Sequence, residues 1–258
     1  MDYIFFMMKT NSFKKICRLA GETCVRYKLI SDGDRILAGL SGGKDSWVLV
    51  HVLEHLRKHA PVEFRIETAT FDPGFEDFGV ENIAAYCKEH NWKHHTVKLD
   101  IPGIIREKNF ASAPCVLCSR LRRGKLYGLS QELKCNKLAL GQHLDDVISS
   151  FFMSLCRGQG ITSMAPLVKP QNPAHPAVIR PLALVPEELI RQCAETLDLP
   201  QKAGKCRYEE TVKNGDRAEF GRLTEMLASR IPNLRENIAH SLTKLEKDHL
   251  LLIPEDID

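Results

Sequence analysis

Hydrophobic residues recur along the chain at two spacings, one typical of buried strands and the other of amphipathic helices. The short apolar or alternating runs predict β-strands at residues 35–40, 64–71, 92–99, 137–141 and 178–179. Apolar positions three or four residues apart predict helices over residues 44–59, 75–90, 115–135, 143–156 and 186–197. Strands that alternate with helices in this order are typical of a doubly wound α/β fold, in which helices cover both faces of a parallel sheet.

The alternation stops towards both ends of the chain. Residues 1–34 carry one apolar helical face, which predicts a helical N-terminal lead-in. The α/β domain is expected over residues 35–200. Residues 201–258 lack strand signals and are expected to form a helical C-terminal extension, with helical spacing over 222–229 and 234–251.

Gly and Pro residues between the predicted elements are concentrated in two segments, 100–114 and 158–176. Both are expected to be irregular loops. In folds of this class the ligand binds in the crevice at the carboxyl ends of the strands, so loops and junctions at those ends are the places to look for chemistry.

The composition is that of a globular protein. The 258 residues are 43% hydrophobic and 27% charged, which excludes a disordered or collagen-like chain. The net charge of +3 neither indicates nor excludes nucleic acid. No stretch approaches the roughly 18 apolar residues of a membrane span, and no signal-peptide cleavage site follows the first residues. We therefore expect a cytoplasmic protein without membrane contact, whose nine cysteines are reduced and serve metal binding, catalysis or packing.

Residues 41–46, Ser-Gly-Gly-Lys-Asp-Ser, join the first strand of the predicted domain to its first helix. Glycine lets a backbone approach an anion closely, and a helix start offers free N–H groups and a favourable dipole. The hydroxyls of Ser41 and Ser46 and the ammonium of Lys44 add donors. The pattern favours a phosphate-binding loop over an ordinary Gly-rich turn. It is not a Walker A loop, because Asp45 stands where that motif has Ser or Thr.

A second strand-to-helix junction, residues 141–146, reads Gly-Gln-His-Leu-Asp-Asp. We expect Asp145 and Asp146 to face the same crevice as the phosphate loop, because parallel strands share their carboxyl-end edge. Adjacent carboxylates suit Mg²⁺, and the alternative is that they only offset the helix dipole. Ala38 and Asp72 are similarly placed candidates for nucleotide contacts.

The hexapeptide at 41–46 resembles the SGGxDS loop of the N-type ATP pyrophosphatases, the PP-loop proteins. The resemblance implies a Rossmann-like fold and cleavage of ATP to AMP and pyrophosphate, with the AMP moiety activating a carbonyl oxygen. It implies catalytic roles for Lys44, Asp45, Asp145 and Asp146. It implies an ATP site formed by Ala38, Ser41, Gly42, Gly43, Lys44, Asp45, Ser46, Asp72, Gly141 and His143. Members of the group carry GHxxDD at the second junction, so Gln142 departs from the pattern.

Cys115 and Cys118 form a C-x-x-C pair at a predicted helix start, where free N–H groups favour thiolates. The pair alone is compatible with redox chemistry, with zinc or with coincidence. A thioredoxin-like site is disfavoured because the pair follows a loop, and structural zinc typically needs two such pairs. Cys206 lies in a polar, basic loop that also favours a thiolate. The other six cysteines mostly fall on predicted helices, and we expect them to be buried core residues.

Residues 114–127 closely resemble the cysteine segment of the tRNA 2-thiocytidine synthetases, iron–sulfur members of the PP-loop group that thiolate cytidine 32 in the anticodon loop. Similarity at 178–182 and 186–190 extends the resemblance over about residues 12–245. The group often has a further cysteine three residues after its third ligand, where this chain has Glu209.

This resemblance implies that Cys115, Cys118 and Cys206 hold a [4Fe–4S] cluster with one open iron. It further implies a sulfur source that is either a cysteine desulfurase or free sulfide, and a homodimeric protein. Thiolate ligation of such clusters is general chemistry.

Basic residues are concentrated around both predicted cysteine sites. They are Arg120, Arg122, Arg123 and Lys125 beside the C-x-x-C pair, and Lys205 and Arg207 beside Cys206. A solvated helix face is the simplest interpretation, but this concentration favours contacts to RNA phosphates. No RRM, KH or OB signature is present, so recognition is expected to depend on shape and on a splayed loop base.

His51, Glu54 and His55 match the H-x-x-E-H motif of inverted zinc proteases. Ten histidines in the chain make coincidence easy. We interpret the three residues as one face of the helix that follows the phosphate loop, and not as a zinc site.

The resemblance thus implies an ATP-dependent tRNA sulfurtransferase that adenylates the C2 oxygen of cytidine 32 and replaces it with sulfur. ATP, Mg²⁺ and a [4Fe–4S] cluster are the implied cofactors, and tRNA is the implied partner. The nearest alternative enzymes are the 2-thiouridine and lysidine synthetases of the same group. A non-catalytic, zinc-stabilised RNA- or nucleotide-binding module is the alternative from another class.

Overall fold

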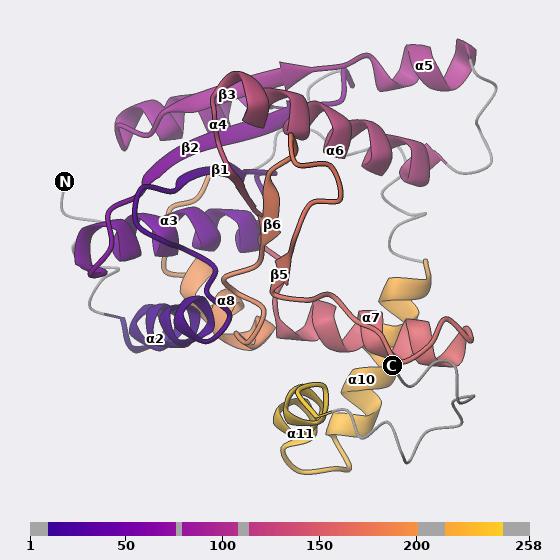
Figure 1. Ribbon diagram of the computed structural model, residues 1–258. Coiled ribbons are helices and arrows are strands. Elements are labelled where there is room, and N and C mark those ends of the chain that lie inside the picture. The colour runs from indigo at the N-terminus through magenta and orange to yellow at the C-terminus, as the bar shows by residue number, and fades with distance from the viewer. Residues whose placement is uncertain (1–9, 76–78, 108–113, 201–214, 245–258) are drawn as a thin grey trace.

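The computed structural model describes residues 10–75, 79–107, 114–200 and 215–244 (Figure 1). Six strands form one sheet in the order β3-β2-β1-β4-β6-β5. Their bounds are β1 (Arg35–Gly39), β2 (Arg65–Asp72), β3 (His94–Lys98), β4 (Lys137–Ala139), β5 (Leu167–Val168) and β6 (Ala177–Ile179). All pairings are parallel except that of β5 with β6. The predicted doubly wound α/β fold is therefore confirmed, with one antiparallel edge strand added.

Helices alternate with the strands as the hydrophobic spacing predicts. The described helices are α2 (Asn11–Arg26), α3 (Lys44–His59), α4 (Val80–Glu89), α5 (Ile101–Glu107), α6 (Pro114–Glu132), α7 (Leu144–Cys156), α8 (Glu187–Ala194), α10 (Asp216–Ala228) and α11 (Leu234–Ser241). Helix α3 ends where Ala60 turns extended ahead of Pro61, because proline disfavours the helical conformation in the residue before it.

Strand β1 divides the core into two sides, because its side chains alternate between the faces of the sheet. Ile36 and Ala38 face a large cluster that includes residues of α2, α3, α4 and α8. Leu37 faces a smaller cluster that includes Leu126 of α6. Figure 1 shows α2, α3 and α8 together on one side of the sheet and α6 on the other. Helices therefore cover both faces, and the site is left to the loops at the strand ends.

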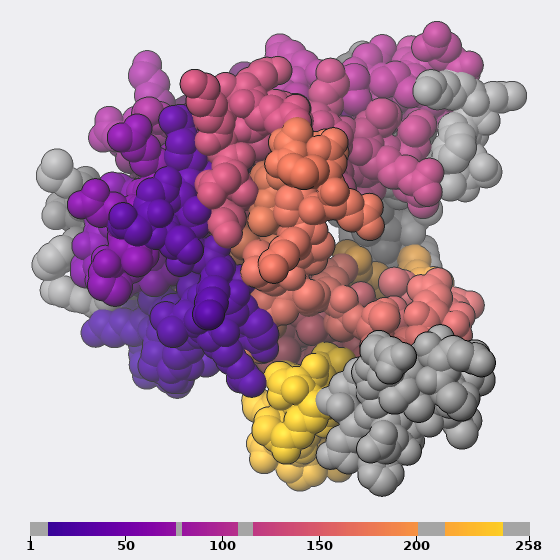
Figure 2. All heavy atoms as spheres, in the orientation of Figure 1, coloured from indigo at the N-terminus to yellow at the C-terminus, as the bar shows by residue number. Residues whose placement is uncertain are grey.

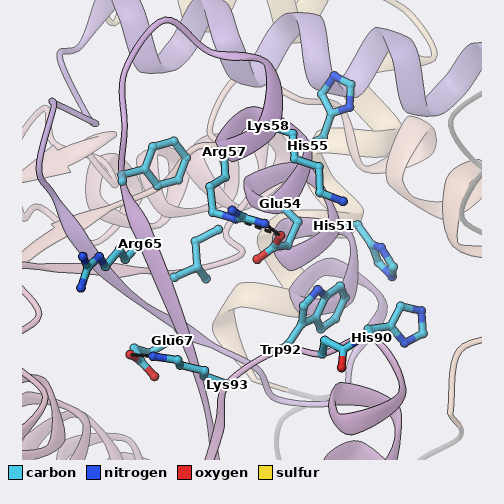
Figure 3. A pocket seen from close by; sticks show the side chains of 13 residues that line it. His51, Glu54, His55, Arg57, Lys58, Arg65, Glu67, His90, Trp92 and Lys93 are labelled. Atoms are coloured by element: carbon cyan, nitrogen blue, oxygen red, sulfur yellow. Dashed lines mark hydrogen bonds and ion pairs between the residues drawn. The ribbon is translucent and has the colours of Figure 1, made fainter.

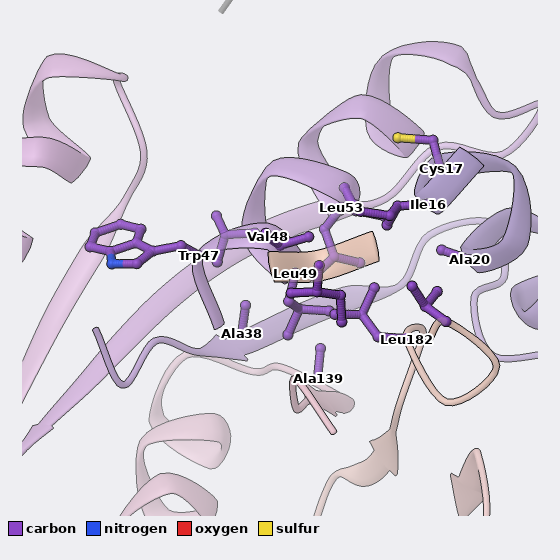
Figure 4. Packing of buried hydrophobic residues seen from close by; sticks show 14 of the residues in the cluster. Ile16, Cys17, Ala20, Ala38, Trp47, Val48, Leu49, Leu53, Ala139 and Leu182 are labelled. Carbon is purple, nitrogen blue, oxygen red and sulfur yellow. The ribbon is translucent and has the colours of Figure 1, made fainter. Parts of the chain in front are cut away.

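The N-terminal helix α2 is part of the large cluster. Phe13, Ile16 and Ala20 are at most 1% exposed. Figure 4 shows Ile16 and Ala20 in the same cluster as Leu53, Leu182 and Ala38 of β1. The lead-in helix is thus packed into the same core as the sheet.

Helices α10 and α11 of the C-terminal extension pack against α7 (Figure 1). Phe220 and Thr224 of α10 are buried. A guanidinium nitrogen of Arg157, at the end of α7, donates to a carboxylate oxygen of Asp216 at 3.0 Å and fixes the start of α10. The extension is thereby attached to the helix that follows β4.

Two segments expected to be irregular contain short elements. Helix α5 lies within the segment 100–114. Pro102 is compatible with this helix because it sits in the first turn, where the missing N–H costs no helical hydrogen bond. The Asp100 carboxylate accepts the N–H of Gly103 at 2.8 Å and supports that turn. Strand β5 lies in 158–176 and is only two residues long, too short for any alternation to be visible. None of the described helices is long and apolar enough to cross a membrane.

Candidate functional site

Two strand-to-helix junctions meet at the centre of the sheet. Strands β1 and β4 are neighbours, and their helical connections leave the sheet in opposite directions, so the order of the strands reverses between them. Residues 41–46 follow β1 and residues 141–146 follow β4. A Cβ atom on Gly141 would lie 3.0 Å from the Asp45 carbonyl oxygen and 3.2 Å from the Ser46 nitrogen. The two loops are therefore in close backbone contact, and any side chain at position 141 would require the Asp45–Ser46 backbone to shift.

The loop at 41–46 is held open by its own serines. Gly42 has a φ of 75°, which glycine adopts without strain. The Ser46 hydroxyl accepts the Ser41 N–H at 3.1 Å and donates to the Gly43 carbonyl at 2.8 Å. Helix α3 begins at Lys44, and a helix start favours an anion because its first N–H groups have no carbonyl four residues earlier in the helix. The Ser46 N–H is bonded to the Gly43 carbonyl at 3.1 Å. The loop has the geometry of an anion cradle.

Lys44 bridges two carboxylates. Its ammonium lies 2.9 Å from Asp45 Oδ1 and 2.7 Å from Glu187 Oε1, at the start of α8. Burial alone lowers the pKa of Lys44, but the carboxylates of Glu187 and Asp45 outweigh it, so the pKa is raised above its ordinary value. The ammonium therefore stays charged at neutral pH and joins the loop to α8.

His143 lies buried beneath three acids. Its Nε2 is 3.8 Å from Asp45 Oδ1 and 3.5 Å from Asp146 Oδ2, and its Nδ1 is 3.8 Å from Asp145 Oδ2. Nδ1 is buried and has no hydrogen-bond partner among the residues that the structure describes. One ligand atom each of Asp45, His143 and Glu187 lies within 4.8 Å of the others, and within the described ranges no other trio of such side chains does so. The arrangement has the donors of a small cation site.

Asp145 is already engaged on both oxygens. Oδ2 accepts the backbone N–H of Glu187 at 2.8 Å, and Oδ1 accepts from Nε of Arg235, on α11, at 2.6 Å. The Asp146 carboxylate accepts the backbone N–H of His143 at 3.2 Å. The two carboxylates that looked equivalent in sequence thus differ: Asp145 ties α7 to α8 and α11, and Asp146 faces His143.

Gln142, the departure from GHxxDD, has a defined partner. Its amide oxygen accepts a hydrogen bond from Nε of Arg180, the residue just after β6, at 3.1 Å. Arg180 also donates to the Ala165 carbonyl at 2.7 Å. Gln142 therefore fixes the direction in which the Arg180 guanidinium points.

The structure separates the two further nucleotide candidates. Ala38 is completely buried, and its side chain packs in the core rather than at the loops. Its backbone lies within the sheet, paired with Thr68 of β2 and Ala139 of β4. Asp72 ends β2 beside β1, and its carboxylate accepts the Gly74 N–H at 2.9 Å.

Of the three predicted cluster ligands, Cys118 is fully described. Cys115 lies in the first turn of α6, though its side chain is outside the description, and Cys206 lies outside the described residues. Residues 115 and 118 are one helical turn apart and share a face. Cys118 is half-buried against the cluster of Phe71, Ile101 and Ile105, an apolar setting suited to a soft thiolate ligand.

Five of the six other cysteines are core residues, as expected. Burial raises the pKa of Cys24 to about 12 and of Cys87 and Cys193 to about 11. Burial, with a contribution from Cys193, raises the pKa of Cys17 to about 12. Burial also raises the pKa of Cys135. Cys156 is an exception: it is exposed, because α7 runs past the sheet at its last turn.

Among the predicted RNA contacts, Arg120, Arg122, Arg123 and Lys125 are exposed on α6, and Lys205 and Arg207 lie outside the described residues. Arg120 and Arg123 line a groove with Arg217 of α10, and Arg122 and Lys125 are not among its lining residues.

The H-x-x-E-H motif is not assembled as a metal site. Figure 3 shows His51, Glu54 and His55 beside one pocket but turned apart. His51 is buried, with Nε2 3.0 Å from the Tyr86 hydroxyl and its ring packed edge-on to Trp92. Glu54 pairs with Arg57 at 2.8 Å. The interpretation as a helix face holds for Glu54 and His55, whereas His51 belongs to an aromatic cluster.

Glu187, Arg235 and Arg180 were missed by the sequence reasoning. Glu187 could have been predicted from the sequence, because it begins a helix shortly after β6. It therefore lies at the same edge of the sheet as the other loops. Arg235 could not have been predicted, since its partner Asp145 is 90 residues away and on another element.

Comparison with known proteins agrees with this geometry. The PP-loop domain family matches residues 8–203. The tRNA-cytidine(32) 2-sulfurtransferase of Syntrophotalea carbinolica is 38% identical over 93% of this chain and 92% of its own length. That of Geobacter sulfurreducens is 38% identical over 93% of each. The U34-tRNA thiolase NcsA from Methanococcus maripaludis, solved with its [4Fe-4S] cluster, is 26% identical with a TM-score of 0.73, covering 91% of this chain and 80% of NcsA. The chain belongs to the tRNA-cytidine(32) 2-sulfurtransferase family of PP-loop proteins.

Proposed function

We propose that the protein is an ATP-dependent tRNA sulfurtransferase that converts cytidine 32 to 2-thiocytidine. The observation that carries the proposal is the backbone contact between the 41–46 loop and Gly141, which places the anion cradle, Lys44 and His143 in one crevice. The names and high coverage of the relatives select the substrate.

In the proposed reaction, the 41–46 loop binds the β- and γ-phosphates of ATP through the N–H groups at the start of α3 and the Ser41 and Ser46 hydroxyls. The C2 oxygen of cytidine then attacks the α-phosphorus, and pyrophosphate leaves into the cradle. A sulfide equivalent adds at C2, and the bond from C2 to the AMP oxygen breaks. The Lys44 ammonium offsets the charge that develops on the departing pyrophosphate.

Mg²⁺ is proposed at Asp45 and Glu187. Their carboxylates are already close together, and in this structure the Lys44 ammonium lies between them. Mg²⁺ prefers oxygen ligands, and both oxygens of Asp145 are occupied by Arg235 and by the backbone. We therefore place the ion beside Asp45 rather than beside the Asp145–Asp146 pair.

A [4Fe–4S] cluster is proposed at Cys115, Cys118 and Cys206. The pairing of two thiols on one helical face, with Cys118 in an apolar setting, fits such a ligand set. When bound, the cluster would supply an open iron for the sulfur, which comes from a cysteine desulfurase or from free sulfide. We also propose that the protein forms a homodimer and is located in the cytoplasm with the tRNA pool. The α/β domain is proposed to be separated from the N-terminal lead-in at residue 34 and from the C-terminal extension at residue 200.

The decisive test is mass spectrometry of tRNA nucleosides from a strain that lacks the gene. We expect 2-thiocytidine to be lost and to return with the wild-type gene, but not with Cys118→Ser or Asp45→Ala. Cys156→Ser, on the exposed end of α7, is the matched cysteine control and is expected to restore it. Unchanged 2-thiocytidine in the deletion strain, or loss of 2-thiouridine instead, would exclude the proposed substrate.

A further inference from the structure

A groove of about 520 Å³ lies between α6, α7 and α10, separate from the crevice of the 41–46 loop. Its described lining is Val116, Ser119, Arg120, Arg123, Met153 and Arg217. Figure 2 shows the surface hollowed between α6 and α7. Three of these six side chains are guanidiniums and none is a carboxylate, so the described wall of the groove is positively charged.

The three arginines are brought together from distant parts of the chain. Arg120 and Arg123 are three residues apart on α6 and therefore share a face. Arg217 is the second residue of α10, which is fixed to α7 by the ion pair of Arg157 with Asp216 at 3.0 Å. The nearest acid in sequence to Arg217 thus has Arg157 as its partner.

Arg180 connects this groove to the crevice. Burial lowers the pKa of its guanidinium, and so do the charges of Arg123 and Arg217, whereas Tyr127 and Asp146 act in the opposite direction. The Arg180 guanidinium therefore interacts electrostatically with two arginines of the groove and with Asp146. The Gln142 amide oxygen and the Ala165 carbonyl hold it in place through hydrogen bonds to neutral acceptors. An anionic ligand in the groove would offset this repulsion.

We propose that the groove binds the sugar-phosphate backbone of RNA beside the nucleotide that enters the crevice. Arg120, Arg123 and Arg217 contact successive phosphates, and Val116 and Met153 pack against a ribose or a base. Guanidiniums spread over two helices match phosphates spaced along a polynucleotide, whereas the contiguous phosphates of ATP match the compact 41–46 loop. The inference rests on the proposed function for the identity of the polymer, and it places Arg217 of α10 in one groove with Arg120 and Arg123 of α6.

The test is binding of an unmodified tRNA transcript with cytidine at position 32, measured at several salt concentrations. We expect Arg120→Ala, Arg123→Ala and Arg217→Ala each to weaken binding about tenfold at low salt. Each is also expected to lower the slope of log affinity against log salt by about 0.7, the value for one phosphate contact of a single strand. Arg222→Ala, an exposed arginine on the same helix as Arg217, is the matched control and is expected to leave both quantities unchanged.

ATP binding and thermal unfolding of each variant report whether the fold and the crevice are intact. The inference is overturned if the three variants bind tRNA with the wild-type slope, or if Arg222→Ala lowers the slope as much as Arg217→Ala does. Neither result depends on turnover. A wild-type protein that forms no 2-thiocytidine yet shows the expected slopes would refute the proposed reaction and leave the groove assignment standing.

Discussion

The ammonium of Lys44 lies 2.7 Å from a carboxylate oxygen of Glu187, 143 residues further along the chain. The contact joins the phosphate loop to the start of α8 and places a cation between Glu187 and Asp45. When a nucleotide draws the ammonium towards its phosphates, the two carboxylates are left facing each other. In the proposed function Mg²⁺ takes its place, because a divalent ion can bind both acids and the phosphates together.

The first prediction therefore concerns Glu187→Gln. It is expected to raise the Mg²⁺ concentration for half-maximal AMP formation at least about tenfold, because a carboxylate ligand is lost. AMP release in the presence of tRNA and sulfide, titrated with Mg²⁺, measures this. Glu188→Gln is the neighbouring control, since Glu188 is exposed and pairs with Arg191. Equal Mg²⁺ dependence in the two variants would refute the proposed ion site.

Gly141→Ala tests the contact between the two loops. The added methyl would meet the Asp45 carbonyl at 3.0 Å, so the phosphate loop must shift. We expect loss of ATP binding, measured by calorimetry, and destabilisation of about 1–3 kcal/mol in chemical unfolding. Gly128→Ala, in α6 with open space around its Cβ, is expected to stabilise the protein by up to about 1 kcal/mol. Full ATP affinity in Gly141→Ala would contradict the close approach.

Arg235→Ala tests the link from the extension to the site. It leaves the half-buried Asp145 carboxylate with only its backbone partner and removes the contact of Arg235 with Glu225. The free energy of unfolding is expected to fall by about 1–3 kcal/mol. AMP formation should fall as well, because the Asp145 loop loses one of its two anchors. Arg191→Ala removes only two exposed helical ion pairs, with Glu188 and Glu195, and should change little.

His51 predicts a dependence of stability on pH. Burial, with a contribution from His90, lowers the pKa of His51 to about 3 in the folded protein, against 6.5 for an ordinary histidine. Between these values the unfolded chain binds a proton that the folded protein does not. Stability is therefore unaffected above about pH 6.5 and is lost as the pH falls towards 3, by up to about 1.4 kcal/mol per pH unit.

Chemical unfolding between about pH 7 and pH 4 measures this loss. His51→Phe is expected to be less stable at neutral pH, because the Tyr86 hydroxyl loses its partner, but to show a shallower decline on acidification. His240→Phe, an exposed histidine of α11, should keep the wild-type slope. An unchanged slope in His51→Phe would show that another group carries the dependence.

The fold could be predicted as far as local spacing determines it. The alternation of Ile36 and Leu37 depends on residues within one strand, and the helical spacing of Val48 and Val52 on residues about one turn apart. Strand β5 could not be predicted, because two residues show no period and its antiparallel pairing is set by contact with β6. Helix α5 was missed because Pro102 and Gly103 resemble a loop, although proline is compatible with a first turn.

The candidate site divides in the same way. The loop that contains Ser41, Lys44 and Asp45 could be predicted because its six residues are consecutive in the sequence. The different roles of Asp145 and Asp146 could not be recognised, because Arg235 sets them through a contact 90 residues away. In the sequence, Gln142 could be seen only as a departure from the GHxxDD motif. Its contact with Arg180, which follows β6, could be found only in the structure.

The ion pair of Asp145 with Arg235 also orders events during synthesis. A ribosome adds residues from the N-terminus, and the sheet with its phosphate loop is complete in sequence before Arg235 exists. Until α11 has left the exit tunnel, Asp145 has only its backbone anchor, so the nascent chain holds an unfinished crevice. The crevice therefore gains this anchor only when residues 234–241 have been made and can pack against α7.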